Sequence, residues 1–345
     1  MTAYKDDILY RVETLRLPHP VTMGTHLQST HSKTRVDSNN GRSSPVFGQV
    51  YWSSTKSLWN TMIYAGALFG GYATFRWDAL LLCLVTSIIT MGSGYSVGLH
   101  RKLIHNSFQC PQWLENVLVY LGVLGSTVGP FSAIEKHDLA DWAHQHPKCH
   151  PYFSHSRNPL IDWLWSLHCD IQLTYPPIIR YEPRIAQNTI YQWLEQTRVV
   201  QLPWASAFYH FGGWSWVFWG IYARIALCTT GQWFMQYLTH HWGSRPRKAK
   251  NASIITSNLP HLGLFTLGES WQNNHQRFPR SARFSLEANQ YDPSWWFIQA
   301  LQTVGLAWSI KQTKPRLQKV MRPVPIEATQ HPAPVKPARQ KVGAK

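Results

Sequence analysis

The chain has 345 residues, of which 44% are hydrophobic and only 14% are charged. Soluble domains carry roughly 25% charged residues, so this composition disfavours a soluble protein and indicates that much of the chain meets lipid. The 18 tryptophans agree with this, because Trp is enriched where membrane and water meet. The net charge of +16 does not indicate a nucleic-acid partner, since the basic residues lie mainly in the two ends of the chain and between apolar segments. Membrane lipids with anionic headgroups are the expected partners of that charge.

Cysteine usage and the first residues exclude two further classes. The sequence contains five cysteines without any paired spacing, namely Cys83, Cys110, Cys149, Cys169 and Cys228. We expect reduced thiols, with neither a disulfide framework nor a thiolate zinc site. The start of the chain, MTAYKDDILYRVETLRLP, has early acidic residues and no apolar run, so it lacks the pattern of a secretory signal peptide. Membrane insertion is expected to use internal segments.

Three regions differ in composition. Residues 1–56 are polar, rich in Ser, Thr, Asn and His, and without apolar periodicity, which predicts a flexible cytosolic tail. Residues 311–345 are basic and rich in Pro, which predicts a second, disordered tail. Residues 57–310 are predicted to form a membrane domain.

The first pair of apolar segments in that domain gives the stronger indication of membrane spans. Residues 58–75 and 79–99 are free of charge, and each is long enough to cross a bilayer as a helix. Arg76 and Asp78 lie between the two segments, so we predict a helical hairpin with its turn at these residues.

A second pair is weaker. Residues 202–222 and 225–240 are predicted to form a hairpin that turns at Arg224, although the later segment is short for a span. Residues 114–134 contain Glu115 and several glycines, and two possibilities stay open for them, a fifth span or a helix in the interface.

Four spans would leave both termini and the long middle region on one side of the membrane. That side holds nearly all the Lys and Arg, so the positive-inside rule predicts that it is cytosolic. The predicted fold class is therefore an all-α integral membrane protein, with four transmembrane helices in two hairpins and a cytosolic helical cap.

A first histidine motif, GLHRKLIHNSF, follows the second predicted span and contains His100 and His105. On an α-helix five steps rotate by roughly 140°, so the two imidazoles do not share one narrow face. That geometry favours ligands for two neighbouring metals over a chelating pair on one metal. A pair of interfacial histidines at the end of a span is the alternative.

A second motif, LGESWQNNHQRFPRSARF, places His275 among amide side chains. By itself this pattern is more typical of a hydrogen-bonded polar patch than of a metal site. Together with GLHRKLIHNSF and the later run YDPSWWFIQALQTVGLAW, however, it closely resembles the membrane fatty-acyl desaturases of the stearoyl-CoA and bacterial acyl-lipid type. The resemblance extends from about Leu58 to Lys311, with a looser middle.

The resemblance implies two iron ions held by an HxxxxH motif, two HxxHH motifs and one additional histidine. His100 and His105 match the first motif. The second motif matches at His137, with Ala140 and Asp141 at the positions of its paired histidines. The remaining matches are His240 for the additional histidine and His275 in the third motif, where Gln272 and Gln276 replace the other two imidazoles.

About half of the usual imidazole set is thus retained. Asp141 has three possible roles, as an iron ligand, as the partner of a histidine ligand, or as a solvated loop residue. Nearby histidines lie close enough in sequence to supply substitutes, namely His144, His146, His150 and His155. Amides ligate iron poorly, so hydrogen-bonding support of the ligands is the role expected for Gln236, Gln272, Asn273 and Gln276.

The function that the resemblance implies is insertion of a cis double bond into a fatty-acyl chain, with dioxygen and with electrons from a ferredoxin or cytochrome b5 type donor. Removing hydrogen from an unactivated methylene requires an oxidant that no side chain provides, so a metal cofactor must supply it. Two alternatives stay open. One is an acyl hydroxylase on the same scaffold, and the other is a metal-poor pseudoenzyme that binds lipid or regulates.

Overall fold

Helices dominate the part of the chain that the computed structural model describes, which comprises residues 35–38, 41–125, 128–247 and 254–313. All of these residues fall in one structural unit that begins at Arg35. Both termini and most of the two predicted tails lie outside the described residues.

The first predicted hairpin is present. Helix α1 (Ser54–Ala65) continues through the π-helix η2 (Gly66–Gly70) into α2 (Gly71–Ala73), and this rod ends where Thr74 leaves the helical region with φ −118°. The returning rod consists of α3 (Trp77–Ile89) and a long π-helix, η3 (Thr90–Ile104), after an extended Arg76. It has 28 residues, and an 18-residue window within it reaches a mean hydropathy of 1.7, so by length and composition it is the one described helix fit to cross a membrane unaided. The turn therefore lies at Arg76, as predicted.

The second hairpin turns at a different residue from the one predicted. Helix α10 (Leu202–Val217) is broken at Gly213, which has φ 64° and ψ −159°, dihedrals that favour glycine. From there the chain is helical through η5 (Phe218–Ala223) and α11 (Arg224–His241). Arg224 lies inside this rod, is only 2% exposed and donates to Gln201 Oε1. The prediction of a turn at Arg224 was wrong, because its guanidinium is buried within the protein and hydrogen-bonded to the Gln201 side chain.

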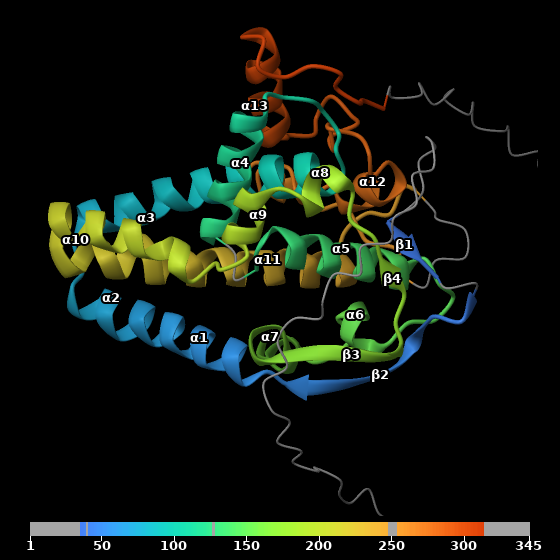
Figure 1. The fold of residues 1–345 in the computed structure, drawn as a ribbon, viewed down its shortest axis with the longest axis horizontal. Helices are drawn as coiled ribbons and strands as arrows, with labels where there is room; N and C mark the ends of the chain where they lie inside the picture. The colour runs from blue at the N-terminus through green and yellow to red at the C-terminus, as the bar shows by residue number, and fades with distance from the viewer. Residues whose placement is uncertain (1–34, 39–40, 126–127, 248–253, 314–345) are drawn as a thin grey trace, which may run out of the picture. The chain divides into compact units, whose positions relative to one another are not determined.

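The tips of the two hairpins lie together, at the left end of the view in Figure 1. Trp216 Nε1 donates to Asp78 Oδ2 over 2.7 Å, and Ser215 Oγ donates to the Thr74 carbonyl over 2.6 Å. The arm of α10 before Gly213 covers residues 202–212, which at about 1.5 Å per residue is too short for the roughly 30 Å hydrocarbon core. The second hairpin is thus shorter on one side than the sequence predicted.

Helix α4 (Gln112–Gly125) packs closely against η3. Gly94 and Gly98 allow this, because a Cβ at either position would overlap the α4 backbone at Gly122 or Leu118. After α4 the chain bends by 75° into α5 (Pro130–His144). The segment 114–134 thus forms a helix on η3 and the start of α5. The bent pair passes the membrane test only when its two helices are taken together.

The predicted all-α fold is wrong in one respect: the described residues are mostly helical but also form two small two-stranded sheets. Strand β2 (Ser44–Trp52) pairs antiparallel with β3 (Cys169–Tyr175), and β1 (Val36–Asp37) pairs with β4 (Ile178–Ile179). β2 lies within the segment predicted as a flexible tail, so regular structure begins before residue 56. The remaining short elements are α6 (Pro151–Ser154), α7 (Pro159–His168), α8 (Pro183–Ala186), α9 (Thr189–Leu194), η4 (Val199–Gln201), η6 (Pro260–Leu262), α12 (Gln272–Arg277) and α13 (Pro293–Thr303).

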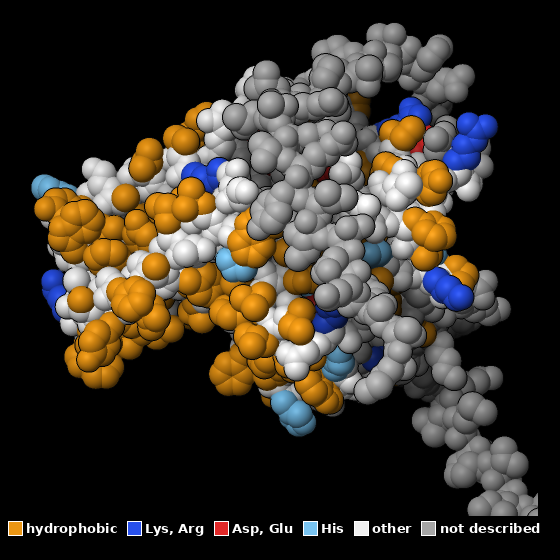
Figure 2. Space-filling model, turned by 90° about the horizontal axis from the view of Figure 1, so that it is seen from below, with side chains coloured by type: hydrophobic (Ala, Val, Ile, Leu, Met, Phe, Trp, Pro, Cys, Tyr) orange, Lys and Arg blue, Asp and Glu red, His pale blue; other side chains and the backbone are white. Residues whose placement is uncertain are grey.

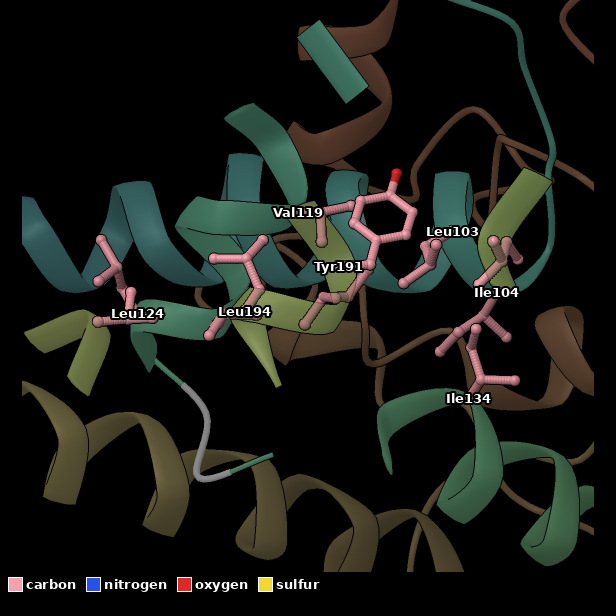
Figure 3. Close-up of a cluster of buried hydrophobic side chains, with 11 residues drawn as sticks. Leu103, Ile104, Val119, Leu124, Ile134, Tyr191 and Leu194 are labelled. Atoms are coloured by element: carbon pink, nitrogen blue, oxygen red, sulfur yellow. The ribbon is translucent and has the colours of Figure 1, made fainter. Parts of the chain in front are cut away.

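A buried apolar cluster fixes the end of η3 against α4, α5 and α9. Figure 3 shows Leu103 and Ile104 from η3 among the side chains of this cluster, with Ile134 from α5 and Tyr191 from α9. Each fully buried aliphatic side chain contributes about 1.5–3 kcal/mol, so this packing holds the helix that carries the first histidine motif.

The hairpins expose apolar side chains on their outer faces. Figure 2 shows hydrophobic side chains gathered toward the hairpin tips. Exposed large side chains there include Leu68, Phe69, Tyr72, Trp77 and Phe211, with Phe69 70% and Phe211 74% exposed. Such patches on soluble monomers are small, so this surface is suited to contact with lipid.

Candidate metal centre

Four imidazoles converge at the end of η3. His100 comes from η3, His105 directly follows it, His137 lies on α5 and His275 lies on α12. One potential ligand nitrogen of each residue lies within 4.8 Å of those of the other three. The structure thus brings together four of the six residues predicted to bind metal.

The π-helix explains how the first motif contributes both of its histidines to one cluster. A π-helix forms i to i+5 hydrogen bonds, and His105 N donates to the His100 carbonyl over 3.1 Å. Residues five apart therefore lie roughly one turn apart, and the two imidazole centroids are 5.0 Å from each other. The prediction of two neighbouring metals assumed an α-helix, whereas this segment is a π-helix, so that geometric argument for two metals does not apply.

His100 is held by a carboxylate from another segment. Its Nδ1 donates to Glu269 Oε2 over 2.7 Å, and Glu269 also accepts a hydrogen bond from Ser96 Oγ. Since the carboxylate accepts at Nδ1, the lone pair of neutral His100 is on Nε2. This Nε2 lies 3.1 Å from His275 Nε2. Two nitrogens bound to one ion at about 2.1 Å lie roughly 3 Å apart, so the spacing suits a shared ion.

His275 and His105 are buried with unsatisfied nitrogens. His275 Nδ1 and His105 Nε2 have no hydrogen-bond partner among the described residues. Burial, reinforced by neighbouring imidazoles, lowers the pKa of both residues well below the ordinary value. They are therefore neutral near pH 7, the form in which imidazole binds a metal.

His137 has carboxylates on one side. Its Nδ1 lies 3.2 Å from Asp138 Oδ1, and its Nε2 lies 3.9 Å from Asp141 Oδ2. Burial by itself lowers the pKa of His137, but these two carboxylates outweigh it and raise the pKa. Asp141 is thus next to the cluster, one helical turn after His137, with its side chain 41% exposed.

The amides of the third motif bind the backbone instead of pointing at the cluster. Gln276 Oε1 accepts from Thr256 N, and Gln276 Nε2 donates to the Ile254 carbonyl. Gln272 Nε2 donates to the Glu269 carbonyl. Asn273 likewise exchanges hydrogen bonds with the backbone of Arg247 and Thr256. These amides fix the short helix that carries His275.

His240 lies in a different group. Its ring centroid is 4.8 Å from that of His155 and 5.4 Å from that of His144. Gln236 supports His240 with its backbone carbonyl and not with its side-chain amide: His240 Nδ1 donates to this carbonyl over 2.7 Å. The six predicted ligands are thus divided, with Asp141 near the first cluster and His240 apart from it.

Three carboxylates that support histidines were missed in the sequence. Glu269 holds His100, Asp138 contacts His137, and Asp162 accepts from His155 Nδ1 over 2.8 Å. Asp138 follows its histidine directly, a local signal that could have been used. Asp162 lies in the first turn of α7 and Glu269 lies in a loop before α12. Their histidine partners come from other segments, so the sequence alone did not reveal these contacts.

The four-imidazole cluster fits a transition-metal ion by its donor type, and two of its rings, His105 and His275, are neutral and each have an unsatisfied nitrogen. Imidazole suits iron, zinc, copper and nickel, so the donor set alone does not choose among them. The carboxylate on His100 is the arrangement that commonly orients metal-bound histidines.

Comparison with known proteins identifies a family. A sequence model described as fatty acid desaturase matches residues 75–301. The matched region includes all six residues predicted from the sequence as metal ligands.

Individual relatives cover most of the chain. The sn-1 stearoyl-lipid 9-desaturase of Anabaena variabilis is 32% identical over 269 residues, which cover 76% of this chain and 94% of that protein. The sn-2 palmitoyl-lipid 9-desaturase of Nostoc sp. (strain 36) is 32% identical over 70% of this chain and 85% of its own length. The acyl-CoA C20 Delta5-desaturase of Anemone leveillei is 30% identical over 69% of this chain and 76% of its own length.

Proposed function

This chain belongs to the fatty acid desaturase family, whose members are oxidoreductases of lipid metabolism, and we propose that it inserts a cis double bond into a fatty-acyl chain. The observation that carries the proposal is the convergence of His100, His105, His137 and His275 to within 4.8 Å. We propose that these imidazoles hold non-heme iron.

Iron bound there would supply the oxidising power, with dioxygen, that is needed to take hydrogen from an unactivated methylene. Forming one double bond gives up two electrons, whereas reducing dioxygen to two waters takes four. The other two must come from a donor, so a ferredoxin or cytochrome b5 type protein is the proposed partner. Relatives with acyl-lipid and with acyl-CoA in their names both match, which supports a fatty-acyl substrate in general.

The chain's own residues orient the centre. Glu269 keeps the proton of His100 on Nδ1 and so directs Nε2 into the cluster. Arg101, fully buried, pairs with Asp292 and lies 3.9 Å from Glu269, which stabilises the carboxylate in its charged form. Phe284 packs on His275 at a centroid distance of 4.3 Å and on the guanidinium of Arg101 at 3.9 Å, excluding water from this side.

We further propose that both hairpins enter the bilayer from the side that holds the histidines. The supporting observations are the apolar rod Trp77–Ile104, the exposed apolar side chains and the paired tips at Asp78 and Trp216. We propose four membrane-embedded segments, of which the arm of α10 before Gly213 is a short one, with a cytosolic cap and both termini on the cytosolic side.

A metal-poor lipid-binding protein is the second candidate function. It is favoured by Gln272 and Gln276, whose amides bind backbone groups where the family motif has histidines. The two candidates predict opposite results for acyl oxidation.

The test is expression of the full chain in cells that supply a donor, with fatty-acid profiling by gas chromatography and mass spectrometry. We expect a new cis-unsaturated acid, lost in His275→Ala and retained in the matched control His261→Ala, whose imidazole is exposed. A hydroxylated product instead would assign the hydroxylase chemistry. No new product, with no iron in the purified protein, would support the metal-poor candidate.

A further inference from the structure

Arg35 reaches the candidate metal centre from outside the segments that carry its histidines. It directly precedes β1, in the stretch of sequence predicted as a flexible tail. Its side chain is only 12% exposed and donates hydrogen bonds to three other parts of the chain. A buried guanidinium is stable only when acceptors from the protein replace the water that it loses, so the identity of these acceptors shows what Arg35 holds in place.

Two of the acceptors are the last carbonyls of η3. Arg35 Nη2 donates to the Leu103 carbonyl over 3.3 Å and also to the Ile104 carbonyl. The last carbonyls of a helix have no partner within the helix, and a basic side chain can supply one. His105 follows Ile104 directly, so Arg35 holds the backbone from which this imidazole enters the cluster.

A third acceptor is the carboxylate that contacts His137. Asp138 Oδ2 accepts from Arg35 Nη1 over 3.1 Å, while Asp138 Oδ1 lies 3.2 Å from His137 Nδ1. One oxygen is thus held by the guanidinium, and the other keeps the proton of neutral His137 on Nδ1 and leaves Nε2 for a metal. Carboxylates commonly orient metal-bound histidines in this way, and here Arg35 fixes the carboxylate in turn.

The fourth acceptor fixes Arg35 itself. Its Nε donates to Glu182 Oε2 over 3.0 Å, and its carbonyl accepts from Arg180 N over 2.9 Å, next to the β1–β4 pair. The guanidinium therefore makes four hydrogen bonds with a planar fork of five donors. A lysine ammonium, a single point with three donors, cannot reproduce them.

We propose that Arg35 is a positioning residue of the metal centre: by holding both the end of η3 and Asp138, it fixes two metal ligands relative to each other. These ligands are His105, after η3, and His137, on α5, whose ring centroids lie 4.7 Å apart. They come from separate segments, so their relative position depends on the contacts that join the end of η3 to α5. This role rests on the proposed function, since it takes the four-histidine cluster as the site that binds iron.

The test measures iron affinity and not activity. Full-length protein in detergent is stripped with a chelator and titrated anaerobically with Fe²⁺. We expect the affinity to fall by about 10 to 100-fold in Arg35→Gln, the usual effect of losing a group that orients metal ligands. Arg35→Lys guards against a variant that merely fails to fold. It keeps the charge and the aliphatic stem but not the fork, so its affinity should lie between those of Arg35→Gln and the parent.

Arg180→Gln is the matched control. The Arg180 side chain is 71% exposed and pairs with Asp37 at 3.0 Å, so this variant weakens the attachment of β1 while the contacts of the Arg35 guanidinium stay intact. It should bind Fe²⁺ as the parent does. An equal loss of affinity in Arg180→Gln would overturn the proposal, because attachment of the strand would then explain the effect of Arg35→Gln.

A double variant tests the route through Asp138. Asp138→Asn alone should weaken Fe²⁺ binding, and Arg35→Gln should then cost less affinity in the Asp138→Asn background than in the parent, because the two residues act on His137 together. Fold-changes that simply multiply would overturn this route. Equal Fe²⁺ affinity of Arg35→Gln and the parent would overturn the positioning role and leave the proposed function intact. A parent that binds no Fe²⁺ would overturn both.

Discussion

Glu269 and His100 are joined by a 2.7 Å hydrogen bond between Oε2 and Nδ1, although 169 residues separate them in the chain. Both side chains are buried, at 9% and 5% exposure. A buried carboxylate so placed determines which nitrogen of His100 faces the cluster. It therefore links the segment before α12 to the π-helix η3 at the candidate metal centre.

Glu269→Gln tests this link. The amide presents both a donor and an acceptor, so it no longer fixes the proton on His100 Nδ1, and we expect iron affinity at the first cluster to fall by about 10 to 100-fold. The measurement is an anaerobic Fe²⁺ titration of the purified protein. Glu287→Gln is the control, since that side chain is 57% exposed. Unchanged affinity in Glu269→Gln would show that Glu269 has only a packing role.

Close packing of η3 on α4 gives a prediction for stability. A Cβ at Gly98 would overlap the Leu118 carbonyl, a backbone atom that cannot move aside cheaply. We expect Gly98→Ala to destabilise the protein by about 1–3 kcal/mol, the usual cost of overpacking, and to lower iron retention because η3 carries His100. Thermal unfolding in detergent measures the change.

Gly231→Ala is the matched control for that substitution. Gly231 is also helical, but nothing lies within 4 Å of a Cβ built there. Alanine has a helix propensity about 1 kcal/mol better than glycine, so this variant should be as stable as the parent or slightly more so. Equal destabilisation of both variants would refute the claim that η3 and α4 need a glycine contact.

The proposed orientation in the membrane predicts the accessibility of single cysteines. In a background with the five native cysteines replaced by serine, His210→Cys marks a hairpin tip and Gln187→Cys marks the side with the histidines. Both positions are exposed. In right-side-out cells a membrane-impermeant thiol reagent should label only His210→Cys. Labelling of both residues from the same side would refute insertion of the hairpins through the bilayer.

Part of the candidate site was predictable, because the spacing of histidines in a motif and the resemblance to a family are both visible in the order of the residues. They identified His100, His105, His137 and His275, which the structure brings together. The relation between the first two was not predictable from α-helical periodicity, because η3 is a π-helix.

The errors in the predicted fold also arise from interactions that local sequence patterns do not reveal. A charged residue between apolar segments indicated a turn at Arg224, yet the guanidinium is buried against Gln201 and the turn is at Gly213. Strand β2 was missed because its partner, β3, lies more than a hundred residues later, and pairing at that distance leaves little trace in local composition.

Asp141 is the residue whose substitution bears most on the proposed function. Its carboxylate lies 3.9 Å from His137 Nε2, and it is located three residues before His144 on the same helix. Because the side chain is 41% exposed and lies beside one proposed ligand, His137, we expect Asp141→Asn to weaken iron binding by about 10-fold, not to abolish it. Complete loss of iron would assign Asp141 as a direct ligand, and no change would assign it to the solvated surface.

Asp141→His tests whether the parent protein is an active desaturase or has lost its metal centre. It places an imidazole where the family's second motif has one, four residues after His137 and so on the same helix face. If the parent desaturates acyl chains as proposed, this variant should bind iron at least as well and make the same product, because another ligand joins a working centre. Iron content and fatty-acid profiles of parent and variant, compared at equal expression, decide the matter. If only Asp141→His binds iron and forms a double bond, the parent has lost its centre through this position, and the desaturase function proposed for it is wrong.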